Sequence, residues 1–220
     1  LGLDAEVVTT DPHTLEDVFA DLERLGDRFD RQERAREVCA DLRERVDRVA
    51  RATATSSETD PCESKPSVAV LDWLDPVMVA GHWIPGMVET AGGTYDIADP
   101  GDPSRPREWD EIRSSDPDVL VAAPCGFDLD QTLANAADLT DRRGWSDLTA
   151  VETGRVYALD GHEYVNRPGP RLVETLELLA GIIHPDAATS AVELPGETDA
   201  VARLSTPEGD AGVADRPVGQ

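Results

Sequence analysis

The sequence predicts an α/β protein: a three-layer lobe with a mostly parallel central sheet, preceded by a long connecting helix. Three apolar segments predict the strands, at residues 67–71 (SVAVL), 118–123 (DVLVAA) and 155–159 (RVYAL). Strands that are apolar throughout are typical of parallel sheets, which are buried on both faces. Each segment is followed by a turn and a helical pattern, and this repeated order predicts α/β units.

Two helices are predicted ahead of the first strand. The first begins after Thr14, a suitable N-cap with Asp17 in the first turn, and Gly26 is its predicted stop. The second covers residues 31–51, where one apolar stripe is separated by residues that are nearly all charged. A long helix with a single stripe is suited to lie along a domain or to join two. The stripe consists of Ala35, Val38, Leu42, Val46 and Val49.

The remaining segments complete this outline. Apolar residues at helical spacing predict further helices at residues 85–91, 109–115, 129–139 and 171–183. Residues 52–66 lack periodicity and predict a linker, and the proline-rich residues 99–107 predict a loop. The segment 187–220 is acidic and rich in glycine, proline and threonine, so we expect it to be a disordered tail.

The charge of the chain excludes some classes of partner. There are 45 acidic and 20 basic residues, giving a net charge of −25, and Lys65 is the only lysine. Such a surface repels nucleic acid and anionic lipid, so no nucleic-acid partner is expected. An acidic surface with little lysine is typical of proteins that work in concentrated salt, where screening removes the self-repulsion. The chain has no apolar run long enough to cross a membrane.

Unusual residues gather in the three turns that follow the predicted strands. Because ligands bind at the carboxyl ends of strands in open α/β sheets, these turns should build one site. The aromatic residues among them suit a large, flat or apolar ligand, although they could instead pack the loops onto the domain. The first turn carries Trp73, Asp75, Pro76, His82 and Trp83, the second Pro124, Cys125, Gly126, Phe127 and Asp128, and the third His162, Glu163, Tyr164, Asn166 and Arg167.

Other kinds of site have weaker support in these turns. A metal site could be assembled from His82, His162, Glu163 and Cys125, but their spacing matches no metal-binding motif. The three cysteines are widely spaced and form neither a disulfide framework nor a zinc ribbon. Carboxylates for acid–base chemistry would come from Asp72, Asp75, Asp128 and Asp160, yet acidic residues are common throughout this chain. Phosphate-binding loops and the G-x-S-x-G motif of hydrolases are absent from the sequence.

Several segments resemble one family in the correct order. These are VLDWLDPVMVAGHWIPGMVETAGG, PSRPREWDEIRSSDPDVLVAAPCGFD and the stretch from GWSDLTAVETGRVYALDGHEYVN to LLAGIIHP, with DPHTLEDVFADLERLG and the long helix ahead of them. Residues 1–184 resemble the cobalamin and iron-siderophore class (class III) of periplasmic-type substrate-binding proteins of ABC importers, and most closely its cobalamin-binding branch. The resemblance implies a remnant of a first lobe at 1–30, a connecting helix at 31–55, a linker at 56–66 and a C-terminal lobe at 67–186. Most of the first lobe, the secretion signal and the lipid-anchoring cysteine would lie upstream.

The resemblance implies transport without catalysis, metal or cofactor. Cobalamin or a related corrinoid would lie between two lobes as the transported ligand. Trp73, Trp83, Phe127 and Tyr164 would stack on it, and Ser104, Asn166 and Arg167 would bind its amides, with Asp75 and His82 also lining the site. Asp110, with Glu111 beside it, would dock onto arginines of the permease transmembrane subunits. The protein would be a monomer outside the cytoplasmic membrane or in the periplasm, lipid-anchored or secreted.

Three alternatives remain at this point. An iron-siderophore binder of the same class would present arginines and tyrosines to an anionic ligand. A cytosolic metal-dependent enzyme would use His82, His162 and Cys125 on the same α/β scaffold. An isolated lobe could also bind a protein partner through its acidic face.

Overall fold

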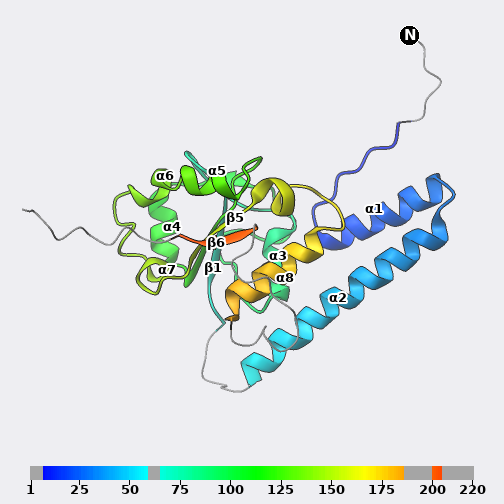
Figure 1. The fold of residues 1–220 in the computed structure, drawn as a ribbon, viewed down its shortest axis with the longest axis horizontal. Helices are drawn as coiled ribbons and strands as arrows, with labels where there is room; N and C mark the ends of the chain where they lie inside the picture. The colour runs from blue at the N-terminus through cyan, green and yellow to red at the C-terminus, as the bar shows by residue number, and fades with distance from the viewer. Residues whose placement is uncertain (1–6, 59–64, 186–199, 205–220) are drawn as a thin grey trace, which may run out of the picture.

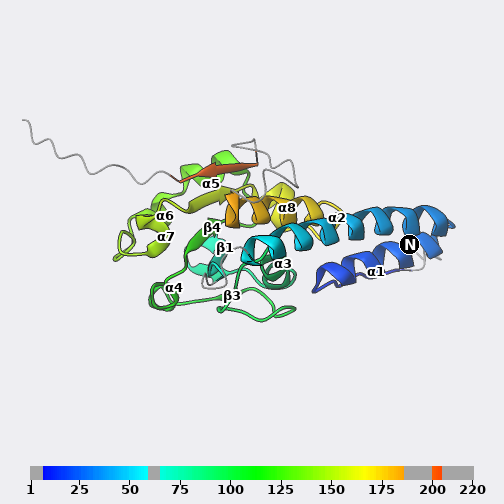
Figure 2. The ribbon, with the colours of Figure 1, turned by 90° about the horizontal axis from the view of Figure 1, so that it is seen from below.

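The structure is a computed structural model and describes residues 7–58, 65–185 and 200–204. Figures 1 and 2 show two parts: an α/β lobe and a pair of antiparallel helices, α1 and α2, that extends beyond it. Helix α2 also runs back along the lobe, where it contacts α3 and α8. The overall arrangement is therefore a lobe with a long helical arm on one side.

The two arm helices, α1 (Leu15–Arg28) and α2 (Gln32–Glu58), begin within a residue of their predicted starts and extend beyond their predicted ends. The predicted cap of α1 is confirmed, because the Thr14 side chain accepts from the Asp17 backbone and Asp17 completes the capping box. The prediction that Gly26 stops the helix is wrong. A side chain there would place Cβ 2.4 Å from the Cβ of Ala35, so Gly26 allows the two helices to approach closely.

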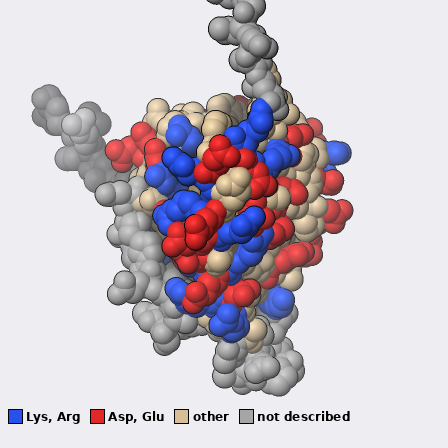
Figure 3. Space-filling model, turned by 90° about the vertical axis from the view of Figure 1, so that its right-hand side faces the viewer, with Lys and Arg blue, Asp and Glu red and all other residues tan. Residues whose placement is uncertain are grey.

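Helix α2 is longer than its apolar stripe predicts and is joined to its neighbours by arginines. It continues to Glu58, so the linker predicted from the residue pattern at 52–66 is wrong over 52–58, as is the start of the linker at 56–66 that the resemblance implies. Residues 59–64 of this linker lie outside the described residues. Arg45 makes a two-pronged ion pair with Glu177 of α8, at 2.9 and 2.6 Å. Arg43 pairs with Glu16 and Glu23 of α1. Figure 3, which faces the outer end of the arm, shows basic and acidic side chains interspersed on this surface.

Within the described residues, the sheet has six strands in the order β3-β2-β1-β4-β5-β6. Its centre consists of β1 (Val68–Leu74), β4 (Val119–Ala122) and β5 (Val156–Leu159), which are parallel to one another. The α/β fold class and the three parallel strands predicted from the sequence are confirmed. The first strand extends beyond its predicted end at Leu71, so Trp73 belongs to β1 and not to the following turn.

Three short antiparallel strands at the two edges were not predicted. Strand β1 turns back into β2 (Val77–Val79), and β2 pairs with β3 (Arg105–Pro106) inside the predicted proline-rich loop. At the other edge, β6 (Val201–Arg203) pairs with β5. The prediction of a disordered tail over 187–220 is therefore wrong at β6, where Val201 is buried against the sheet, while 187–199 and 205–220 lie outside the described residues. Strands of two or three residues are too short to show the alternation that predicts a strand.

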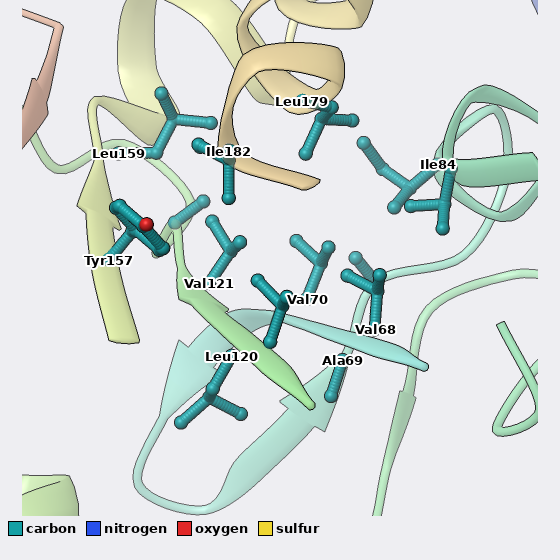
Figure 4. Close-up of a cluster of buried hydrophobic side chains, with 14 of the residues drawn as sticks. Val68, Ala69, Val70, Ile84, Leu120, Val121, Tyr157, Leu159, Leu179 and Ile182 are labelled. Carbon is teal, nitrogen blue, oxygen red and sulfur yellow. The ribbon is translucent and has the colours of Figure 1, made fainter. Parts of the chain in front are cut away.

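Helices cover both faces of the sheet, which confirms the three layers (Figure 1). Helices α3 (Ile84–Thr90) and α8 (Leu172–Ile183) lie on one face, and α4 (Trp109–Ser115), α6 (Ala137–Thr140) and α7 (Thr149–Glu152) lie on the other. The predicted helix at 129–139 is divided into α5 (Leu129–Ala134) and α6. In Figure 4, Val70 and Val121 point towards Leu179 and Ile182 of α8, forming the core between sheet and helices.

Candidate functional site

The segments that follow the three parallel strands lie together at one edge of the sheet, as the topology predicts. The backbone N–H of Cys125, after β4, donates to the carbonyl of Asp72 in β1 at 2.8 Å. The N–H of His162, after β5, donates to the carbonyl of Phe127 at 2.9 Å. A Cβ on Gly161 would lie only 2.2 Å from the carbonyl oxygen of Pro124, so these two turns touch through their backbones.

Trp73 and Phe127 form an aromatic pair at this edge. Their ring centroids are 5.5 Å apart, in an edge-to-face arrangement that is favourable for aromatic rings. The indole N–H of Trp73 donates to the carbonyl of Asp75 at 2.9 Å, which fixes the ring against the end of the β1–β2 hairpin. Both rings are half-buried, so part of each is open to a ligand.

Asp75 lies in the hairpin turn and is bound by another side chain of the protein. Its carboxylate accepts a hydrogen bond from Arg142 at 2.9 Å, and 72% of the side chain is exposed. A ligand would therefore meet Asp75 as one half of an ion pair.

Trp83 and His82 lie between the lobe and the start of the arm. The indole N–H of Trp83 donates to the carbonyl of Val165 at 3.0 Å, which ties the loop before α3 to the segment after β5. His82 has a left-handed backbone, with φ of 51°, and its ring lies 5.0 Å from that of His13 and 5.7 Å from that of Trp83. A pocket of about 190 Å³ opens beside these rings, lined by Thr14, Leu15, Glu16, His82, Trp83, Gly86, Met87, Thr90 and Pro100.

Ser104 holds a buried corner behind His82. Its hydroxyl accepts from the backbone N–H of Gly81 at 3.0 Å. Asp72 is 8% exposed, and its Oδ1 is buried without a hydrogen-bond partner among the described residues. Burial raises the pKa of Asp72, an effect that the interaction of its carboxyl with Ser104 partly offsets. Ser104 therefore has a structural role in addition to its predicted role in ligand binding.

The segment after β5 forms a π-helix, η1 (Gly161–Val165), capped by Asp160 through the N–H of Glu163. Asn166 donates to the carbonyl of Gly161 at 2.9 Å, so its amide holds this turn closed. Tyr164 packs against the core, with the guanidinium of Arg171 over its ring. Arg167 donates a hydrogen bond to a ring nitrogen of His162 at 2.6 Å. Because its side chain is exposed, Arg167 is the most accessible charged residue of this segment.

The predicted docking residues lie on α4, on the face of the sheet opposite α3 and α8 (Figure 1). Asp110 has 85% of its side chain exposed and pairs with Arg113 at 2.9 Å. Glu111 closes the first turn of α4 by accepting from the N–H of Glu108 at 2.8 Å, and it lies 3.4 Å from Arg107. Asp110 is therefore the more accessible carboxylate of the two.

A sequence model of the family described as periplasmic binding protein matches residues 1–163. The chain belongs to this family. Over 70 residues it is 41% identical to the uncharacterized ABC transporter substrate-binding lipoprotein YvrC of Bacillus subtilis (strain 168), a match that spans 32% of this chain and 19% of YvrC. The matched part is thus a small share of that relative's length.

Solved structures of periplasmic binding proteins share the fold. An ABC transporter substrate-binding protein from Listeria monocytogenes EGD-e is 22% identical with a TM-score of 0.71, and the match covers 83% of this chain and 69% of that one. An ABC-type Fe3+-hydroxamate transport system from Saccharomonospora viridis DSM 43017 is 27% identical with a TM-score of 0.63, covering 81% of this chain and 57% of that one.

Sequence reasoning about this periplasmic binding protein did not identify two residues beside the site. Arg142 binds the hairpin that carries Trp73, and His13 reaches the segment between α3 and β3, where its Nδ1 lies 3.1 Å from the carbonyl oxygen of Gly101. Neither belongs to a motif, and each meets its partner only in the fold. Across the described ranges 7–58, 65–185 and 200–204, no three His, Cys, Asp or Glu residues gather in a way that could hold a metal ion. None of the described helices is both long and apolar enough to span a membrane.

Proposed function

We propose that this chain is part of the substrate-binding component of an ABC importer, and that it binds cobalamin or a related corrinoid for delivery to the permease. The observation that supports the proposal is the aromatic edge where the three central strands end. Membership of the periplasmic binding protein family supports the transport role. The ligand would lie between this lobe and a second one, and the protein would act without catalysis or a resident cofactor, as a monomer outside the cytoplasm.

The shape of the edge favours a broad, flat ligand. Trp73 and Phe127 present half-buried rings beside each other, and such rings bind apolar faces through large contact area with little loss of side-chain freedom. Trp83 lines the pocket beside His82, where it offers a second aromatic surface. Arg167 and His82 add hydrogen-bonding groups for peripheral amides, whereas the amide of Asn166 is already used within the turn.

Delivery would use the exposed carboxylates of α4. We propose that Asp110, with Glu111 beside it, pairs with arginines of the permease. Each exposed ion pair is worth about 0.2–1 kcal/mol, so docking would depend on several such contacts together.

An iron-chelate ligand is the second candidate. The 27% identical structure of the Fe3+-hydroxamate transport system supports it, as does the exposed guanidinium of Arg167, which would bind an anionic chelate. The aromatic pair favours the corrinoid. A charged chelate gains less binding free energy from one indole ring and one phenyl ring than from the charge-assisted hydrogen bonds of arginines.

The test is a titration of cyanocobalamin and of a ferric hydroxamate into the full-length gene product, followed by tryptophan fluorescence. We expect quenching by cyanocobalamin. A second titration, by equilibrium dialysis, measures the affinity of a double variant that carries both Trp73→Ala and Trp83→Ala. Phe29→Ala is its control, because Phe29 is an exposed aromatic residue on the arm. Affinity should fall in the double variant and persist in the control. Quenching by the ferric hydroxamate alone would replace the corrinoid with the chelate, and unchanged affinity in the double variant would refute the site.

A further inference from the structure

Arg142 connects two parts of the lobe that are far apart in the sequence. Its Nη2 donates to the carbonyl of Leu74 at 2.8 Å and to the carboxylate of Asp75 at 2.9 Å, both at the end of the β1–β2 hairpin. Its guanidinium carbon also lies 5.6 Å from the ring centroid of Trp109, the first residue of α4. One side chain therefore contacts both the hairpin and the helix.

The contacts around Arg142 leave it little freedom. Its Nε donates to the carbonyl of Asp138 at 2.7 Å, and 23% of the side chain is exposed. Trp109 is held as well, because its indole N–H donates to the carbonyl of Arg143 at 3.0 Å and its ring stacks on that of buried Trp145, 6.2 Å away. A shift of the hairpin is therefore transmitted to packed groups with few alternative positions.

The two ends of this connection are the two surfaces of the proposed function. The hairpin carries Trp73, whose indole N–H binds the carbonyl of the same Asp75 that Arg142 holds. Helix α4 carries Asp110, directly after Trp109. We propose that Arg142 is a positioning residue that couples the hairpin at the ligand edge to the docking helix α4. Its role in transport rests on the proposed function, while the coupling itself is a property of the lobe.

Arginine is suited to this task and lysine is not. A guanidinium donates in fixed directions and at the same time lies flat on an aromatic ring, whereas an ammonium group is a single point charge. Arg142 uses both properties, since it binds two oxygens of the hairpin and covers the face of Trp109. Arg142→Lys should therefore keep the charge and lose the coupling.

The first experiment needs no ligand. The indole N–H signals of the four tryptophans are followed by NMR in the 220-residue chain and assigned with single Trp→Phe variants. Asp75→Ala removes one contact of Arg142 at an exposed position, and we expect it to shift the Trp109 signal. In an Arg142→Met background the same substitution should leave Trp109 unshifted, which makes the pair a double-mutant cycle.

Arg203→Met is the matched control, because Arg203 lies over the ring of Tyr157 at the same 5.6 Å but on the β6 edge. Asp75→Ala should still shift Trp109 in that background. Arg142→Lys serves if Arg142→Met fails to fold, and it should also abolish the shift. The proposal is overturned if Asp75→Ala leaves Trp109 unmoved in the otherwise unaltered chain, or if the shift survives in the folded Arg142 variants.

The second experiment adds cyanocobalamin to the full-length gene product. We expect the Trp73 and Trp109 signals to move together in the unaltered protein, and Trp73 alone to move in Arg142→Lys. Movement of Trp73 with Trp109 fixed in the unaltered protein would overturn the coupling of ligand to α4. If no indole signal responds, the proposed ligand is wrong, and the ligand-free cycle still decides whether Arg142 couples the hairpin to the helix.

Discussion

Gly161 lies where the turns after β4 and β5 meet, and a single added methyl group there should destabilise the protein. A Cβ would lie 2.2 Å from the carbonyl oxygen of Pro124 and 2.6 Å from that of Ala123. Both are backbone atoms, so neither can rotate away as the tip of a side chain could. Adding a methylene-sized group to a packed interior costs about 1–3 kcal/mol. Since 1 kcal/mol corresponds to roughly 2–4 °C in a chain of this size, Gly161→Ala should lower Tm by roughly 2–12 °C.

Gly169→Ala is the matched control for this substitution, because no atom of the described residues lies within 4 Å of the position of its Cβ. Restricting the unfolded chain stabilises such a variant by about 0.4–1 kcal/mol, so its Tm should stay the same or rise slightly. Thermal unfolding followed by circular dichroism measures both variants. Displacing Pro124 also moves Phe127, so cyanocobalamin affinity should fall in Gly161→Ala and persist in Gly169→Ala. Equal Tm values for the two variants would refute the close contact between the turns.

Three further predictions concern charge. Raising KCl from about 0.1 M to about 1 M shortens the Debye length from about 10 Å to about 3 Å and should raise Tm by screening the net charge of −25; a Tm that falls with KCl would contradict this. Asp72→Asn should raise Tm at pH 7, because burial raises the pKa of Asp72 above its ordinary 3.8 and the folded state loses stability as pH rises through that higher pKa. The difference in Tm from the unaltered chain should disappear below pH 3.8. A lower Tm of the variant at pH 7 would refute the reasoning. Asp110→Lys should slow uptake while leaving ligand affinity intact, and the same charge change at exposed Asp27 of the arm should affect neither; transport at the normal rate in Asp110→Lys would refute the docking role.

The sequence predicts the interior of this lobe better than its edges. Helix α4 begins and ends at the residues that its apolar spacing predicts, 109 and 115. The central strands could be predicted as well, since four or more consecutive apolar residues are typical of strands that are buried on both faces of a sheet. The strands β2, β3 and β6 are defined by pairing with distant segments, and two or three residues carry no periodic signal. Gly26 shows the same limit, because its reason for being glycine is Ala35 on the next helix.

The candidate site could also be predicted only in part. The meeting of three turns could be predicted, because parallel strands end at one edge of a sheet. Which polar side chains remain available to a ligand could not, since this depends on hydrogen bonds that only the fold creates. Asn166 and Ser104 are both occupied by backbone groups of neighbouring turns. Arg142 could not be identified from the sequence, because its partners Leu74 and Trp109 lie far from it in the chain and meet it only in the fold.

The high acidity of the chain bears on how the two proposed surfaces would work together. In about 1 M salt the Debye length is about 3 Å, so a carboxylate as exposed as Asp110 would interact with a permease arginine only near contact. Long-range attraction would then contribute little, and the position of α4 would determine whether the proposed pair forms. Arg142 is mostly buried and acts through hydrogen bonds and ring contact, which salt weakens much less. A docking helix held by Arg142 would therefore keep its register in concentrated salt, where charge alone would not align the two proteins.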